Sequence, residues 1–215
     1  MSSERFDVIN NPVRGRLNAW FLAALDGYMH WKYADVKSHL FKQAHSVVVE
    51  LGPGSGANLR YLFPGTKLIA IEPNRHMHPL LRQRAKQRGI DLDLRELAGE
   101  HLDLPSASVD FVFSSLVLCS VDQPEQVLAE VRRVLRPGGC FACIEHVVAP
   151  AGSGIHRLQR MIQRPWKWTF EGCDLCRDTG SVLQSAGFAC VDVQPLLLPT
   201  IFIPIRHQIT ALCYN

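Results

Sequence analysis

The sequence predicts an α/β fold, with a Rossmann-like, seven-stranded and mostly parallel sheet, helices on both faces and an N-terminal helical cap. Three observations predict it. Short β-rich runs alternate with longer stretches of helical periodicity from residue 46 onward. Most residues in several of these runs are apolar, as in parallel strands that are covered on both faces. A glycine-rich turn directly follows the first run.

The first half of the alternation begins with "SVVVEL" (46–51), which we expect to form a buried strand. A helix is predicted over 56–63, starting at the third glycine of the turn. "KLIAIE" (67–72) predicts the second strand, and a helix follows over about 75–88. "IDLDLREL" (90–97) alternates apolar and acidic residues, which favours a strand near the edge of the sheet.

The middle of the chain continues the pattern. "VDFVFSSLVL" (109–118) predicts a buried strand. The segment 123–135 has apolar residues at helical spacing, and "RPGG" (136–139) is expected to end that helix. "CFACIEHVV" (140–148) predicts the next strand.

The last part departs from strict alternation. A Gly/Ser loop and then aromatic residues occupy 150–176, which we interpret as a lid over the site. A helix is predicted near 177–186, and strands near 188–195 and 201–212. We expect the final two strands to form an antiparallel pair at an edge of the sheet.

The length of 215 residues fits one domain with a substantial core, and the 47% of hydrophobic residues is typical of a globular protein. We expect a single domain over 1–215. Its expected parts are a helical cap (1–45), a cofactor-binding core (46–149), the lid (150–176), and a C-terminal helix with its strand pair (177–215).

The charge and cysteine content restrict the partners and the location. The net charge of +3 is spread along the chain, so we expect no nucleic-acid partner. No segment is apolar over the ~18 residues that a membrane span needs, and the N-terminus is polar, so we expect neither stable membrane insertion nor a secretory signal. Peripheral membrane contact stays open. Seven cysteines, an odd number, indicate a reducing compartment, and we expect a cytoplasmic protein.

The glycine turn indicates a nucleotide-type ligand. Gly52, Gly54 and Gly56 follow the first strand, where ligands bind in open α/β sheets. Their G-x-G-x-G spacing differs from the G-x-G-x-x-G of NAD sites. Glu50, within the strand, would repel a pyrophosphate and attract a cationic ligand. Glu72 ends the second strand, where a carboxylate can accept hydrogen bonds from a ribose diol. S-adenosylmethionine, a cation without phosphates, fits these residues.

Two further strand ends complete the expected cofactor site. "AGEHLDLP" (98–105) follows the third strand, where Glu100 and the backbone can meet a purine ring. "SSLVLCSV" (114–121) leaves the fourth strand beneath the cofactor.

Several motifs together resemble the class I S-adenosylmethionine-dependent methyltransferases, above all the methyltransferase-like family that includes the animal membrane-associated thiol S-methyltransferases. The matching stretches are "ELGPGSGAN" (50–58), "IEPN" (71–74), "SLVLCSV" (115–121), "VLAEVRRVLRPGG" (127–139), "EHV" (145–147) and "EGC" (171–173). The resemblance implies that the three glycines line the cofactor and that Glu72 holds the ribose hydroxyls. It also implies that Gly99 and Glu100 lie by the adenine and Leu116 under the methionine part.

Two departures from the family are visible. Glu72 stands where related sequences often have Asp, which is chemically tolerable. The hydrophobic N-terminal anchor of the animal enzymes is not in this sequence, which places their membrane residence in doubt for this chain.

The candidate catalytic residue is His146, near the end of the fifth strand. A neutral imidazole there can accept a proton from a thiol, hydroxyl or amine nucleophile. The alternative is a histidine that only orients a loop through local hydrogen bonds. Transfer to a nucleophile that is already deprotonated needs little beyond in-line positioning.

Aromatic residues are the candidates for the acceptor pocket. Trp166, Trp168 and Phe170 alternate in the lid, and Trp31 lies in the cap with Trp20, Tyr28 and Tyr33. Aromatic faces attract cations and provide an apolar wall. Ordinary packing of the lid and of the cap helix is the alternative explanation.

The cysteines raise the question of a metal. Cys140 and Cys143 have zinc-like spacing, as do Cys173 and Cys176. Residues three apart on a strand point to opposite faces, which argues against a shared metal at the first pair, and we expect no metal site in the chain. Cys173 and Cys176 are candidates for redox-active or substrate-lining residues, and Cys119 is expected to be buried.

We therefore expect an S-adenosylmethionine-dependent methyltransferase with a small, apolar acceptor, with a thiol favoured by the resemblance. A quinone-precursor carbon, a phospholipid amine, or a small amine or hydroxyl are alternative acceptors. A non-catalytic cofactor-binding module is the alternative of another class.

Overall fold

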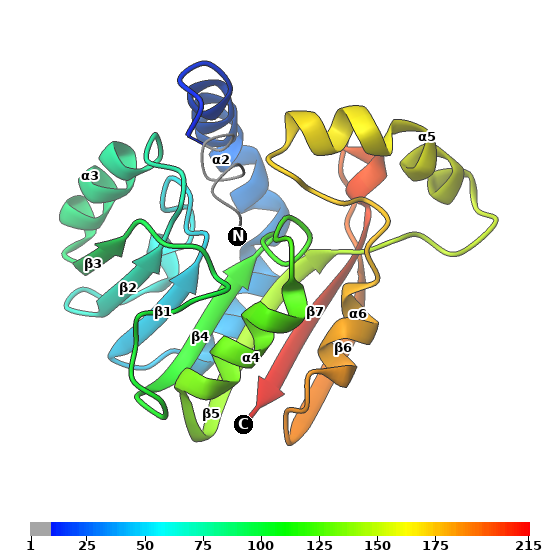
Figure 1. Cartoon of the computed structure of the whole chain (residues 1–215). Helices are drawn as coiled ribbons and strands as arrows, with labels where there is room; N and C mark the ends of the chain where they lie inside the picture. Colours follow the sequence, from blue (N-terminus) through cyan, green and yellow to red (C-terminus); the bar gives the residue numbers. More distant parts are fainter. Residues whose placement is uncertain (1–9) are drawn as a thin grey trace.

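The structure, a computed structural model, describes residues 10–215. These residues build one seven-stranded sheet in the order β3-β2-β1-β4-β5-β7-β6 (Figure 1). The strands are β1 (Val47–Leu51), β2 (Lys67–Ile71), β3 (Asp91–Arg95), β4 (Val109–Ser115), β5 (Leu135–His146), β6 (Cys190–Leu197) and β7 (His207–Tyr214). The α-helices are α2 (Arg14–Leu40), α3 (His78–Arg88), α4 (Pro124–Val134), α5 (Gly154–Thr169) and α6 (Thr179–Ser185). Short 3₁₀ turns are η1 (Phe41–Gln43), η2 (Leu59–Tyr61) and η3 (Ile203–Ile205).

The sheet is parallel except for β7, which runs antiparallel to both β5 and β6. The predicted fold is therefore confirmed, and so are the edge position of β3 and the antiparallel pair at the other end. The chain returns from β3 to β4, which lies on the far side of β1. The carboxyl ends of β1 and β4 consequently flank the point where the strand order reverses, the usual ligand-binding position of such sheets.

Both faces of the sheet are covered, because successive side chains of each strand point to opposite sides. Val49 of β1 packs with α4 and α6 residues in one buried cluster. Its neighbour Val48 packs in the other cluster with Tyr33, Phe41 and Leu81, which come from α2, η1 and α3. The continuous apolar strands of the sequence follow from this burial on two sides.

Helix α2 serves two regions of the molecule. Its C-terminal half covers one face of the sheet, where Tyr33 is fully buried and its hydroxyl donates to Oε1 of Gln208 at 2.9 Å. Its N-terminal half rises above the carboxyl ends of the strands, opposite α5 (Figure 1). The N-terminal half of α2 and the helix α5 together cover the strand ends, and we call them the roof of the site.

The helix predicted over 56–63 is wrong. After Gly56 the chain forms turns and only the short η2, before Pro64 follows. Forming the first turn of a helix is unfavourable, and the few residues between Gly56 and Pro64 add too few hydrogen bonds to offset it. The missing Cβ of Gly56 makes room for Leu59, because a Cβ would lie 2.7 Å from Leu59 Cδ1.

The predicted role of "RPGG" is only half right. Helix α4 ends at Val134 as expected, but residues 136–139 belong to β5, which starts at Leu135. Leu135 pairs with Val109, and the register then shifts before Cys140 pairs with Phe111. The irregularity absorbs the extra residues of the turn within the strand.

Candidate functional site

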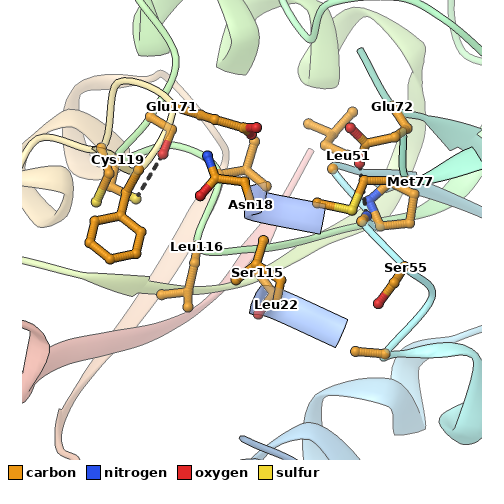
Figure 2. Close-up of a pocket in the computed structure, with 18 of the residues that line it drawn as sticks. Asn18, Leu22, Leu51, Ser55, Glu72, Met77, Ser115, Leu116, Cys119 and Glu171 are labelled. Carbon is orange, nitrogen blue, oxygen red and sulfur yellow. Dashed lines mark hydrogen bonds between the residues drawn. The ribbon is translucent and has the colours of Figure 1, made fainter. Parts of the chain in front are cut away.

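A cavity of about 330 Å³ lies at the carboxyl ends of the parallel strands, beneath α2 and the C-terminal end of α5. Figure 2 shows Glu72 and Met77 toward one side of it and Cys119 and Glu171 toward the other. The size is in the usual range for a small-molecule site. The predicted residues that line it are Gly52, Gly54, Glu72, Gly99, Glu100, Leu116, His146, Trp166 and Phe170.

The glycine turn brings bare backbone to the cavity. Gly52 and Gly54 have φ of +58° and +57°, a conformation that glycine adopts without strain. A Cβ on Gly52 would lie 2.6 Å from Cγ2 of Val117. The turn therefore fits only with glycine at Gly52, and it leaves the backbone open to a ligand.

Glu72 is fixed at the end of β2 by two backbone amides. Its Oε2 accepts a hydrogen bond from Gly54 N at 2.8 Å, and its Oε1 accepts one from Asn74 N at 2.8 Å. Burial raises the pKa of Glu72 to about 7, although both hydrogen bonds favour the carboxylate. Each oxygen keeps a second lone pair, so this carboxylate can also accept from a diol.

Glu50 and Gly56 lie behind the cavity wall rather than in it, which corrects the expected direct contact of Glu50 with a cation. Glu50 Oε1 accepts from Asn58 Nδ2 at 2.6 Å, and Asn58 Oδ1 accepts from Lys37 Nζ at 2.7 Å. Burial raises the pKa of Glu50 to about 7 and lowers the pKa of Lys37 to about 8. Asn58, which Glu50 holds through this hydrogen bond, does line the cavity.

Leu116 begins the loop that passes under the cavity, and it has a positive φ of 60°. That conformation is costly for a side chain with a Cβ. The loop is held by Glu145, whose Oε1 accepts from the backbone amides of Val117 at 2.9 Å and Leu118 at 3.0 Å. Glu145 thus fixes the loop that passes under the cavity.

Three reactive side chains meet at the wall opposite Glu72. Cys119, His146 and Cys173 all line the cavity and are buried. Their ligand atoms lie within 4.8 Å of one another, and His146 Nε2 is 3.0 Å from Cys173 Sγ. Trp166 Nε1–H also donates to Cys173 Sγ at 3.2 Å. The sequence prediction placed His146 here and Cys119 in a buried position, but it did not bring the three together.

The three groups shift one another's pKa values. A hydrogen bond from Cys119 lowers the pKa of Cys173 well below its usual range, and His146 and Trp166 lower it further against the effect of burial. The same hydrogen bond, together with burial, raises the pKa of Cys119. Burial lowers the pKa of His146, but the neighbouring Cys173 outweighs it and raises that pKa overall. Of the two sulfurs, Cys173 is therefore the more acidic.

The predicted aromatic wall is partly wrong. The lid is the helix α5, and residues four apart lie on one face of a helix. Trp166 and Phe170 therefore both line the cavity, with ring centroids 4.3 Å apart, whereas Trp168 points away and is 68% exposed. Trp31 is 70% exposed and packs against Lys32 instead.

The side chains of α2 that line the cavity are not the Trp and Tyr residues expected from the sequence. The side chains that line it are Asn18, Phe21, Leu22, Leu25, Asp26, Met29 and Lys37. Phe202 and Ile205, from the segment before β7, close the same side. The lining residues of α2 recur at helical spacing, and this periodicity is the signal in the sequence that could have identified them.

The other cysteines separate. Cys140 and Cys143 lie in the two different core clusters, on opposite faces of the sheet. Cys176 does not line the main cavity, in contrast to Cys173. The interpretation of Cys173 and Cys176 as a pair at the substrate therefore holds for Cys173 alone.

The comparisons with known proteins agree with this geometry. The family model for a methyltransferase domain matches residues 49–143. The chain is 34% identical over 201 residues to thiol S-methyltransferase TMT1B of Homo sapiens, covering 88% of this chain and 82% of that protein. It is also 34% identical over 165 residues to thiol S-methyltransferase TMT1A of Homo sapiens, covering 75% of this chain and 68% of that protein. The chain belongs to this methyltransferase family.

Solved structures share the fold of this methyltransferase. A SAM-dependent methyltransferase from Thermotoga maritima has a TM-score of 0.66 at 20% identity, covering 98% of this chain and 100% of that one. An N-methyltransferase from Haemonchus contortus, solved with phosphomonomethylethanolamine and S-adenosylhomocysteine, has a TM-score of 0.70 at 10% identity, covering 100% of this chain and 61% of that one.

The cofactor of the methyltransferase is S-adenosylmethionine, and the cavity fits it. Among the described residues that line the cavity, Lys37 is the only Lys or Arg, and its Nζ is already bonded to Asn58. The acidic residues Glu72, Glu100 and Glu171 line the same cavity, as does Asp26, whose Oδ2 pairs with Arg60 at 2.6 Å. Such a wall suits a cation without phosphates.

The methyltransferase shows no helix within residues 10–215 that is long and apolar enough to cross a membrane.

Proposed function

We propose that this methyltransferase transfers the methyl group of S-adenosylmethionine to the thiol of a small, apolar acceptor. The observation that carries the proposal is the division of the cavity. Glu72, which is bonded to Gly54 of the glycine turn, lies toward one side and Cys119 toward the other, with Asn18 and Ser115 between them (Figure 2). His146 and Cys173 lie beside Cys119. The names of the relatives, which are thiol S-methyltransferases, support the choice of acceptor.

The cofactor would be held by residues at three strand ends. Backbone at Gly52 and Gly54 would pass close to its methionine part, and Glu72 would accept hydrogen bonds from both ribose hydroxyls. Gly99 and Glu100 would contact the adenine. When bound, the cofactor supplies an electrophilic methyl group on a positively charged sulfur.

The acceptor would lie against Trp166, Phe170 and the Cys119 wall. The aromatic rings exclude water and attract a positively charged sulfur nearby. In the transfer, a lone pair of the acceptor sulfur forms the new S–CH₃ bond while the bond from the methyl group to the sulfonium breaks. The acceptor leaves as a thioether and its proton passes to solvent. His146 as the proton acceptor stays a prediction, since its Nε2 already faces Cys173 Sγ at 3.0 Å.

The test compares acceptors that differ only in the nucleophilic atom. An alkyl thiol, and the alcohol and amine of the same carbon skeleton, are offered to the purified protein, and S-adenosylhomocysteine is measured. We expect turnover with the thiol and at least tenfold less with the other two. Faster methylation of the amine or alcohol would overturn the thiol assignment. Cofactor binding without turnover on any acceptor, quinols included, would favour the non-catalytic module.

We further propose that the protein acts in the cytoplasm on small molecules and not on nucleic acid. All seven cysteines are free, as suits a reducing compartment. Exposed apolar side chains on α2 and α5, such as Trp20, Met161 and Trp168, would allow peripheral membrane contact. Cell fractionation tests the location, and a protein found in the wash-resistant membrane fraction would contradict it.

A further inference from the structure

We propose that Cys119, His146 and Cys173 bind one zinc ion, with its fourth coordination position open toward the acceptor cavity. Each side chain offers one ligand atom, the three atoms lie within 4.8 Å of one another, and all three side chains are buried. They come from the loop after β4, from the end of β5 and from the turn after α5. The inference deepens the proposed thiol activity. Zinc binding itself does not depend on that proposal, but the role of the ion in the reaction rests on it.

The donor set is one that zinc prefers. Two thiolates and one imidazole leave the fourth position of a tetrahedral ion for water or substrate, as in catalytic zinc sites. Zn–S bonds of about 2.3 Å and Zn–N bonds of about 2.0 Å place the ligand atoms roughly 3.5–3.8 Å apart. The contact of 3.0 Å between His146 and Cys173 would widen slightly, and the separations of up to 4.8 Å would shorten, to reach this range.

The surrounding hydrogen bonds hold both cysteine loops in place. The amide of Asp174 donates to the carbonyl of Cys119 at 2.9 Å, which ties the residue after Cys173 to the other cysteine. Gln163 of α5 donates to Asp174 Oδ1 at 2.5 Å, and Glu145 Oε2 accepts from Cys119 N at 3.2 Å. Such outer contacts orient ligands before a metal binds.

Trp166 adds a contact at the sulfur itself. Its Nε1–H donates to Cys173 Sγ at 3.2 Å, an interaction that favours a thiolate and leaves other lone pairs of the sulfur for a metal. Because all three ligand residues line the cavity, the open position faces the space in which an acceptor would lie.

The ion would bind the acceptor as well as the protein. A thiol that takes the fourth position loses its proton to water and stays on the ion as a thiolate. Its sulfur then forms the bond to the methyl group, and the electron pair of the broken S–CH₃ bond stays on the sulfur of the departing S-adenosylhomocysteine. No oxidant or reductant is needed.

The first test measures metal in the intact, reduced protein. The chain is equilibrated with zinc sulfate, desalted and analysed for metal, and cobalt(II) is added separately to look for thiolate-to-cobalt charge-transfer absorption. We expect about one zinc per chain in the wild type, and at least tenfold less in Cys119→Ser and Cys173→Ser. Cys176→Ser is the matched control, because it removes a thiol three residues away that does not line the cavity. Circular dichroism checks that each variant is folded.

A second measurement needs no variant. Zinc should protect Cys119 and Cys173 of the wild type from alkylation, while the exposed Cys190 reacts at an unchanged rate. The proposal is overturned if the wild type retains no more zinc than the two serine variants. It is also overturned if Cys119 and Cys173 form a disulfide and take up no metal when reduced again. Turnover of the alkyl thiol is recorded in parallel, so that zinc binding without thiol methylation refutes only the proposed function.

Discussion

The backbone amide of Gly54 lies 2.8 Å from Oε2 of Glu72. This hydrogen bond joins the glycine turn after β1 to the end of β2, so the two motifs that the sequence singled out separately form one rigid corner of the cavity. The corner is set before a ligand arrives, which reduces the ordering cost of binding.

The first prediction concerns the carboxylate of this corner. Glu72→Ala removes the acceptor for the ribose hydroxyls and should weaken S-adenosylmethionine binding by about 10- to 100-fold, since hydrogen bonds to a charged group contribute about 1.5–3 kcal/mol. Calorimetric titration measures the change. Glu96→Ala, at a partly exposed ion pair with Arg75, is the control and should bind as the wild type does. Equal affinities of Glu72→Ala and wild type would contradict the assignment.

The second prediction concerns pH. The folded pKa of Glu72 is about 7, well above that of a free carboxyl, so the group gains its charge as pH rises through about 7. Cofactor affinity should therefore increase from pH 6 to pH 8. The effect on folding stability has the opposite sign and a lower window. Between the ordinary pKa of 4.5 and the folded pKa of about 7, the folded state holds a proton that the unfolded state has released, so the free energy of unfolding falls with rising pH and levels off above about pH 7. Titrations of Glu72→Gln should show a much flatter profile, and an equally steep one would exclude Glu72 as the group responsible.

The third prediction separates steric fit from backbone strain. Gly52→Ala combines a positive φ with a contact of 2.6 Å to Val117, whereas Gly138→Ala has a φ of +78° and meets nothing within 4 Å. Both changes should destabilise by about 1 kcal/mol through strain, and the first by a further 1–3 kcal/mol through overpacking. Urea denaturation measures both. Equal losses would show that Val117 moves aside freely.

The fourth prediction uses two tryptophans of one helix. Trp166→Ala removes part of the cavity wall and a hydrogen bond to Cys173, so KM for the thiol acceptor should rise by about tenfold, the loss of ~1.4 kcal/mol. Trp168→Ala, on the exposed side of α5, should leave KM unchanged. Steady-state kinetics at saturating cofactor gives both values, and a similar effect of the two variants would contradict the orientation of α5.

The fifth prediction addresses the buried Lys37–Asn58–Glu50 chain. Lys37→Met leaves Glu50 buried without its cation. It should destabilise the protein by about 3 kcal/mol between pH 7 and 8, above the pKa of Glu50 (about 7) and below that of Lys37 (about 8). Adding Glu50→Gln removes the uncompensated charge and should recover part of that loss. Denaturation of the single and double variants measures the difference. A double variant that is less stable than Lys37→Met would show that Glu50 is stabilised by other groups.

The centre of the sheet could be predicted from the sequence because β1, β2, β4 and β5 are buried over most of their length and contain apolar runs. The edge strand β3 was predictable from its alternation of apolar and acidic residues. The sequence predicted a lid over 150–176 but not that it contains the helix α5, and the reason is local. Its start carries a clear signal, because Ser153 Oγ accepts from His156 N at 3.1 Å as an N-cap. Pro165 lies near the end of the helix, and aromatic residues occupy every second position from Trp166 to Phe170, which hides the helical period.

The cofactor end of the site was also predictable, since the glycine turn and Glu72 are local motifs at strand ends. The cluster of Cys119, His146 and Cys173 was not. His146 and Cys173 are 27 residues apart, and they meet only because the turn after α5 folds back over the end of β5. No periodicity or spacing encodes such a return of the chain.

The roof over the cavity has a consequence for turnover. Asn18 of α2 donates to the carbonyl of Thr169 at 3.1 Å, and Asn74 Nδ2 donates to Glu171 Oε1 at 2.8 Å. These contacts join α2 and the segment after β2 to the end of α5, which covers the cavity. We predict that they break and re-form in each catalytic cycle, when the spent cofactor leaves. We expect product exit, rather than bond making, to limit the steady-state rate, with a burst of product in the first turnover.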